Sequence, residues 1–177
     1  WIVFYRNPSP PIVFRIGTIK NKLALLFPFE RKMPRRSNGY VILVTGKNYT
    51  ELEHNWDVAF GLFTTNKVYA INATNTNSGG ERYLASYARE YGNSAFDNDF
   101  LKIHPAFLKG RAAVVNNDLT EAKAQAKIIK TILEKVMARA GAEYIKKWKE
   151  NADIAAGQHQ LAEGLGFIYS LRFAKVH

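Results

Sequence analysis

The feature that most constrains the fold of this chain is a stretch near its carboxyl end, residues 157–173, with the sequence GQHQLAEGLGFIYSLRF. At helical spacing this stretch is apolar on almost every side, and helices of that kind lie at the centre of a bundle. One polar strip interrupts the apolar surface, because His159, Glu163 and Ser170 lie near one another on a helix. The stretch therefore predicts a central helix that carries a buried polar strip.

A second stretch, residues 51–63 (ELEHNWDVAFGLF), has the same character. Its polar residues Glu53, His54 and Asp57 share one arc of a helix, and large apolar side chains cover the other side. Thr50 and Glu53 have the spacing of a capping box, in which each side chain accepts a hydrogen bond from the other residue's backbone N–H. We expect a helix that begins after Thr50 and packs close to the central one.

Three further helices are predicted by the spacing of apolar residues, over residues 81–91, 97–117 and 118–149. Pro105 lacks a backbone N–H, so it either kinks the second of these helices or begins its main part. His104 beside it is interpreted as a helix-end residue without a special role. Asp118 and Glu121 have capping-box spacing at the start of the long helix. No strand pattern of any strength appears in this part of the chain, so residues 48–177 are predicted to form an all-α helical bundle.

Four glycines lie inside the predicted helices, at Gly61, Gly157, Gly164 and Gly166. Glycine in a helix costs roughly 1 kcal/mol against alanine, so its presence needs a reason. We expect these glycines to mark places where two helices approach each other closely.

The first quarter of the chain, residues 1–47, differs from the rest. Short apolar runs alternate with basic clusters, and five of the six prolines lie here. We predict an irregular basic segment that is not part of the domain and packs poorly on it. Two interpretations stay open. The segment is either over-read or frame-shifted sequence that does not belong to the domain, or a basic arm that binds a membrane surface.

The composition argues against several classes of function. The chain has no cysteine, so it forms neither a disulfide nor a thiolate metal site. The net charge of +10 invites a nucleic-acid partner, but residues 1–48 hold nine Lys/Arg against one acid, and residues 49–177 hold sixteen against fourteen. Since the folded part is nearly balanced, we expect no nucleic-acid binding. No apolar run approaches the roughly 20 residues of a transmembrane helix, and no nucleophile elbow or phosphate-binding loop is present.

Four motifs carry a resemblance to a known family. They are HNWDVAFG (residues 54–61), RYLASYAREY (82–91), FLKGRAAV (107–114) and HQLAEGLGFIYSLRF (159–173). Over about residues 47–177 the chain resembles an uncharacterised bacterial family, the domain-of-unknown-function family four-eight-five-six. Its members resemble imelysin-like proteins, which are helical bundles of the bacterial cell envelope linked to iron uptake.

The resemblance implies a location and a partner. A protein of this kind is expected in the periplasm or as an outer-membrane lipoprotein, with another envelope protein as its partner and an association with iron or haem uptake. Family members are longer at both ends, so the chain is expected to be a fragment. Imelysin-like proteins also carry a Gly-x-His-x-x-Glu motif, which Gly157 and His159 begin, whereas the acid is Glu163, one place later.

The candidate metal site consists of His54 and Asp57 on the first helix and His159 and Glu163 on the last, with Glu53 beside them. Helical bundles build metal centres from imidazoles and carboxylates that project inward from facing helices, and this donor set would suit iron or zinc. A metal-dependent enzyme that uses the same cluster is the alternative function, and it requires an open coordination position.

A structural interpretation competes with the metal site. A buried carboxylate needs a partner, and Arg111 in the motif KGRAA is available. Asp57, Arg111 and Glu163 would then form a buried ion-pair network, with the histidines as hydrogen-bond donors. Removing one partner from such a network costs about 3–5 kcal/mol. The chain would in that case be a structural or binding domain without catalytic residues.

Overall fold

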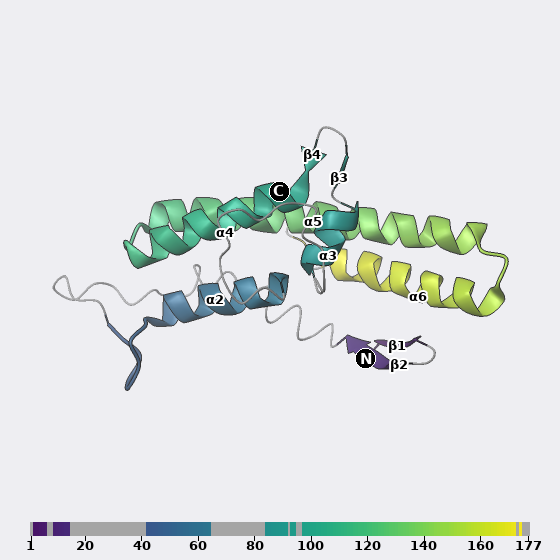
Figure 1. The fold of residues 1–177 in the computed structure, drawn as a ribbon, viewed down its shortest axis with the longest axis horizontal. Helices are drawn as coiled ribbons and strands as arrows, with labels where there is room; N and C mark the ends of the chain where they lie inside the picture. Colours follow the sequence, from purple (N-terminus) through teal and green to yellow (C-terminus); the bar gives the residue numbers. More distant parts are fainter. Residues whose placement is uncertain are drawn as a thin grey trace.

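The structure is a computed structural model that describes residues 2–6, 9–14, 42–64, 84–91, 93–94, 97–172 and 174. Its helices are α2 (Glu51–Phe63), α3 (Leu84–Tyr91), α4 (Asp99–Val115), α5 (Leu119–Glu150) and α6 (Ile154–Leu171). Figure 1 shows α5 running through the whole molecule, with α4 beside one half of it and α6 beside the other. The predicted fold class, an all-α helical bundle, is confirmed.

The centre of the bundle is α5 and not α6, so the prediction of a central helix at residues 157–173 is wrong. The residues that α5 buries are Ala122, Gln125, Ala126, Ile129, Ile132, Leu133, Val136, Met137, Ala140 and Gly141. On α6 the buried residues are Gly157 and Gly164, which face α5. An apolar surface on every side indicates that a helix needs other elements packed against it, but it does not show which helix lies at the centre of the bundle.

Aromatic side chains fill the core between α2 and α4. Phe63 stacks on Phe100 and on Phe107, with ring centroids 5.9 and 5.3 Å apart, and Phe60 meets Phe107 edge-on at 5.4 Å. All four of these side chains are buried. Aromatic pairs of this geometry stabilise a core beyond the area that they bury.

Trp56 is fixed between the same two helices. Its indole Nε1 donates a hydrogen bond of 3.1 Å to the backbone oxygen of Phe107, and 3% of the residue is exposed. A Cβ atom added at Gly110 on α4 would lie 1.9 Å from the indole ring, so glycine at this position makes the close approach of α2 to α4 feasible.

A second close approach joins α5 to α6. A Cβ atom at Gly164 would lie 3.2 Å from the backbone oxygen of Gly141, and one at Gly141 would lie 3.1 Å from Ile168. The expectation of close contact therefore holds at Gly164. It is wrong at Gly61, which is exposed and has nothing within 4 Å of an added Cβ atom.

The helix ends follow the local sequence closely. The Thr50–Glu53 capping box is present in both halves, with N–O distances of 2.7 and 3.2 Å. At the start of α5 the Asp118 carboxylate accepts a hydrogen bond from the backbone N–H of Glu121, as predicted, but the Glu121 carboxylate accepts one from Gln125.

The α4 helix continues through Pro105, which lies inside it. His104 is therefore not a helix-end residue but a buried one, with 3% exposure. Its ring lies against Phe60 and Phe100, with centroids 6.1 and 5.7 Å away. A proline inside a helix is compatible with continuation when packing on both sides outweighs the lost hydrogen bond.

Two short antiparallel strand pairs accompany the helices. In the first, β1 (Ile2–Arg6) pairs with β2 (Ser9–Phe14), with Ile2 opposite Phe14, and β1 contacts α6. In the second, β3 (Asn93–Ser94) pairs with β4 (Asp97–Asn98) immediately before α4, where no strand was predicted. Residues 15–41 lie outside the described residues, so the predicted boundary at residue 47 stays a prediction.

Candidate functional site: two separate polar clusters

The first polar cluster joins α2 to α4 and consists of Glu53, Asp57 and Arg111, here called the Arg111 cluster. The Arg111 guanidinium donates to both Asp57 oxygens, from Nε at 2.7 Å and from Nη2 at 3.2 Å. Its Nη1 donates to Glu53 Oε1 at 3.3 Å. Arginine suits this position because its planar fork can hold one carboxylate with two parallel hydrogen bonds.

The Arg111 cluster lies at the surface and not in the buried centre that the sequence suggested. The exposed side-chain fractions are 25% for Arg111, 18% for Glu53 and 45% for Asp57. The pKa of Glu53 is lowered, first by the hydrogen bond from the Thr50 backbone N–H and then by the Arg111 charge. Glu53 therefore caps α2 and also ties it to α4. Since solvent screens the cluster, its contribution to stability is below that of a buried ion pair.

The second polar cluster joins α6 to α5 and α3 and consists of Tyr87, Tyr144, His159 and Glu163, here called the Glu163 cluster. His159 and Glu163 are one helical turn apart, with Nε2 and Oε1 separated by 3.3 Å. The Tyr144 hydroxyl lies close to Glu163 and to Tyr87, near enough for each to influence its pKa. The side chains of His159 and Glu163 are 32% and 17% exposed, so the carboxylate is the more enclosed member of the pair.

Burial dominates the electrostatics of the two tyrosines. It raises the pKa of Tyr87 to about 12, with a further contribution from the negative charge of Glu163. Burial also raises the pKa of Tyr144, and its hydrogen bond to Glu163 acts in the same direction. Both phenols are therefore neutral at physiological pH. In that state they are suited to donating a hydrogen bond to a carboxylate and not to acting as a base.

Two further aromatic side chains, Phe167 and Tyr91, pack against the tyrosines of the Glu163 cluster. Phe167 lies 4.8 Å from Tyr87 and 5.8 Å from Tyr144, and Tyr91 lies 6.1 and 6.0 Å from the same two rings. The Lys147 ammonium closes one side, because it donates to the Tyr91 hydroxyl at 3.0 Å and lies 5.5 Å from the Tyr144 ring. Three helices thus meet around one carboxylate.

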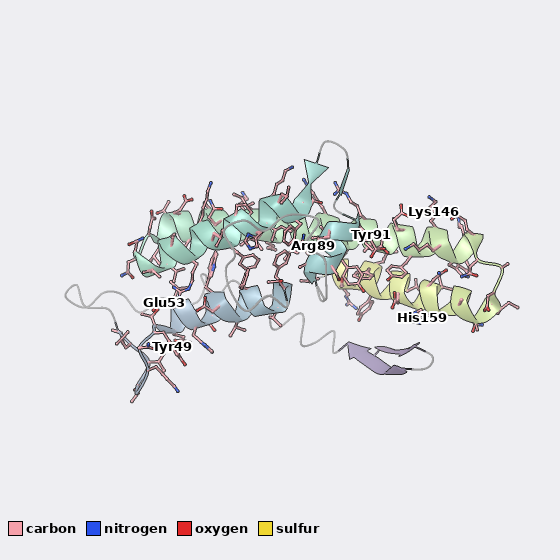
Figure 2. All side chains as sticks on the ribbon, in the orientation of Figure 1. Tyr49, Glu53, Arg89, Tyr91, Lys146 and His159 are labelled. Atoms are coloured by element: carbon pink, nitrogen blue, oxygen red, sulfur yellow. The ribbon has the colours of Figure 1, made fainter. Side chains whose placement is uncertain are left out.

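The structure does not bring the predicted metal ligands together. Figure 2 shows Glu53 and His159 toward opposite ends of the molecule, because α2 packs on α4 whereas α6 packs on the far half of α5. Glu163 is consequently not a partner of Arg111. His54 is exposed and stacks on Tyr49, with ring centroids 5.4 Å apart. In the described part of the chain, no three His, Asp or Glu residues lie together in a group that could hold a metal ion.

The third member of the predicted polar strip, Ser170, is hydrogen-bonded within its own helix. Its hydroxyl donates to the Phe167 backbone oxygen at 2.6 Å and lies 3.6 Å from the Met137 sulfur. The strip is therefore divided between the Glu163 cluster and an ordinary helix–helix contact.

Two buried charges were missed by the sequence interpretation. The Arg89 guanidinium lies 3.4 Å above the Phe100 ring centroid, and 7% of the residue is exposed. Asp99, at 2% exposure, is paired with Arg139 of α5. A signal for Arg89 existed, since it shares one helical face with the buried Ala85. Arg89 therefore packs α3 against α4, and Asp99 connects α4 to α5.

These features define a class: an all-α helical-bundle domain in which two polar clusters connect neighbouring helices. A family model described as Domain of unknown function (DUF4856) matches residues 27–177, and the chain belongs to this family. The match begins ahead of the domain boundary predicted at residue 47. No curated protein and no solved structure matched the chain. Among the described residues, the search for a helix with the length and apolar character to span a membrane found none.

Proposed function

We propose that this chain is a structural or binding domain of the bacterial cell envelope, in which the two polar clusters hold helices in place and perform no catalysis. The observation that supports this role is that each cluster places an acidic side chain against a polar side chain of a neighbouring helix. Arg111 is hydrogen-bonded to Asp57 across α2 and α4, and the Tyr144 hydroxyl lies beside Glu163 across α5 and α6.

The geometry favours this role over a metal-dependent enzyme. A catalytic metal needs about three protein ligands and one open position. In the Glu163 cluster only His159 and Glu163 are ligands of that kind, because the other two members are neutral tyrosines. Glu163 lies against Tyr144 of α5, whereas His159 pairs with Glu163 within α6. We therefore propose that Glu163 sets the position of α6 against α5 and that His159 supports this carboxylate.

The envelope location and the association with iron or haem uptake are proposed from the family resemblance. Cell fractionation of a bacterium that makes the natural protein tests the location, with the protein expected in the periplasmic or outer-membrane fraction. Recovery in the cytoplasmic fraction would refute it. Growth of a deletion strain in iron-limited and iron-replete media tests the association with uptake, and equal growth defects in both media would contradict it.

A metal titration tests the structural role of the Glu163 cluster. We expect the melting temperature of the protein to be unchanged by Fe²⁺ or Zn²⁺, since a ligand that binds the native state would raise it. The matched variants are His159→Ala and His54→Ala, because His54 is an exposed histidine outside that cluster. Stabilisation by metal that disappears in His159→Ala but persists in His54→Ala would overturn the proposal in favour of a metal site.

A further inference from the structure

Helix α3 lies where the two halves of the bundle meet. The first half, here called the α4 half, consists of α2, α4 and the first part of α5. The second, here called the α6 half, consists of α6 and the last part of α5 (Figure 1). The halves meet on α5 at a junction between two residues. They are Arg139, which is paired with Asp99 at the start of α4, and Gly141, which lies against Gly164 of α6.

The short helix α3 contacts both halves through side chains that leave it on different sides. Toward the α4 half, the Arg89 guanidinium lies 3.4 Å above the centroid of the Phe100 ring. Toward the α6 half, Tyr87 meets Phe167 edge-on, with ring centroids 4.8 Å apart. Arg89 and Tyr87 are two residues apart, which places them about 200° apart around a helix. Ala88 lies between them on the helix surface and is 0% exposed, so α3 is packed into the molecule on this side.

The last turn of α3 is also attached to α5. The Lys147 ammonium donates a hydrogen bond of 3.0 Å to the Tyr91 hydroxyl and lies 3.4 Å from a carboxylate oxygen of Glu90. The Tyr91 ring lies 6.0 Å from that of Tyr144. The ion pair is solvent-exposed and contributes little, so the packed rings and the Arg89 stack are the main contacts of α3. One short helix thus contacts α4, α5 and α6 at the same time.

The continuity of α5 does not by itself make the two halves open together. A helix in a protein is stabilised mainly by the packing of its apolar face. The last part of α5 can therefore separate together with α6 while the first part stays packed on α4. Within the described part of the chain, α6 packs mainly on α5. The contact between Tyr87 and Phe167 consequently gives α6 a link to the α4 half that does not run through α5.

We propose that α3 couples the two halves of the bundle, so that they open together while α3 is docked and the α6 half opens separately once α3 leaves α4. Proteins open in contiguous units whose stability follows from the contacts between them. Opening of the α6 half alone breaks the contact between Tyr87 and Phe167 as long as Arg89 keeps α3 on α4. The inference goes beyond the proposed role of the two polar clusters, since Arg89 belongs to neither.

Hydrogen exchange of the full chain tests the proposal, measured by NMR at increasing urea concentrations below the unfolding transition. In the parent protein we expect the slowest amides of α4 and α6 to exchange at rates that agree within about threefold after correction for intrinsic rates, because one opening exposes both. In Arg89→Ala the slowest amides of α6 should exchange at least about tenfold faster than those of α4. A merely destabilising substitution would accelerate both sets equally.

The matched control is Ile129→Val, because Ile129 is buried on α5 about two turns ahead of the junction. It should accelerate exchange in α4 and α6 by the same factor. Arg89→Met keeps an apolar side chain over Phe100 and provides the same measurement if Arg89→Ala does not fold.

Two results would overturn the coupling role of α3. One is a tenfold difference between α4 and α6 that is already present in the parent protein, and the other is equal exchange of the two helices in the Arg89 variant that folds. Either result would leave the proposed function standing, since metal titration and fractionation test it separately.

Discussion

Replacing Gly110 with alanine should test whether the docking of α2 on α4 depends on the Trp56 indole. The added Cβ atom would lie 1.9 Å from Cζ2 and 2.2 Å from Cη2 of that ring. Carbon atoms in contact pack at about 3.5–4.0 Å, so the ring would have to move by roughly 1.5 Å or more. It is a rigid group and 3% of the residue is exposed, which leaves it little room.

The expected cost follows from three effects. Overpacking of a core typically costs about 1–3 kcal/mol. Movement of the ring also weakens the 3.1 Å hydrogen bond from Trp56 to the Phe107 oxygen, and a buried polar group without its partner costs about 1–3 kcal/mol. Alanine gains about 1 kcal/mol over glycine in helix propensity. We therefore expect Gly110→Ala to lower the free energy of unfolding by about 2–4 kcal/mol.

Urea denaturation followed by circular dichroism measures this change, and two other variants serve as controls. Gly61→Ala places the same substitution inside α2, where nothing lies within 4 Å of the added Cβ atom, so it should stabilise by up to about 1 kcal/mol. In a Trp56→Phe background the two nearest ring atoms are absent, so Gly110→Ala should cost at least about 1 kcal/mol less. The reasoning is refuted if Gly110→Ala is as stable as Gly61→Ala, or if its cost is the same in both backgrounds.

The remaining predictions concern the two polar clusters. Arg111→Ala should lower the free energy of unfolding by about 1–2 kcal/mol, between the values for exposed and buried pairs, because the pair with Asp57 is partly exposed; a loss of 3–5 kcal/mol in urea titrations would show that solvent screens it less than we infer. The pKa of Glu53 is lowered in the folded protein, so its charged form contributes stability above the ordinary value of 4.5, and this stability is lost as pH falls through the folded value. Glu53→Gln keeps the capping geometry, so the difference in unfolding free energy between this variant and the parent protein should shrink below that pH. A difference that stays constant would argue against the role of the charge. The raised pKa of Tyr87 has the opposite effect, since the stability that it contributes is present below the ordinary value of 10.0 and is lost as pH rises toward about 12. A Tyr87→Phe variant should therefore lose less stability over that interval than the parent protein. Equal loss in both proteins would contradict the assignment.

The local sequence alone determined where α2 and α5 begin and which face of α5 is buried. Thr50 and Glu53 specify a helix start because the hydrogen bonds of a capping box join residues three apart. The apolar spacing of residues 118–149 predicted the inner face of α5 for the same reason, since side chains one turn apart share a face whatever the helix packs against. These features need no knowledge of the rest of the chain, and they yielded the all-α fold class.

The pairing of Arg111 with Asp57 could be proposed from the sequence, but the place of Glu163 could not. Both acids require a partner when enclosed, and nothing within α6 distinguishes an arginine on α4 from a tyrosine on α5. The distance between α2 and α6 depends on how α2 packs on α4 and how α4 and α6 pack along α5. These arrangements are set by contacts between residues far apart in the chain. Gly164 shows the physical reason, since it lets α6 approach α5 and brings Glu163 to Tyr144.

Tertiary structure also decided which apolar helix lies at the centre. The sequence of α6 is apolar on nearly every side, yet in the described structure its outward face, including Leu165, is exposed. An apolar pattern indicates how much of a helix surface needs to be covered, but it does not indicate which element covers that surface. The helix with neighbours on both halves is α5, because α4 and α6 pack along its two ends. That arrangement separates the Arg111 cluster from the Glu163 cluster, and only the packed chain could reveal it.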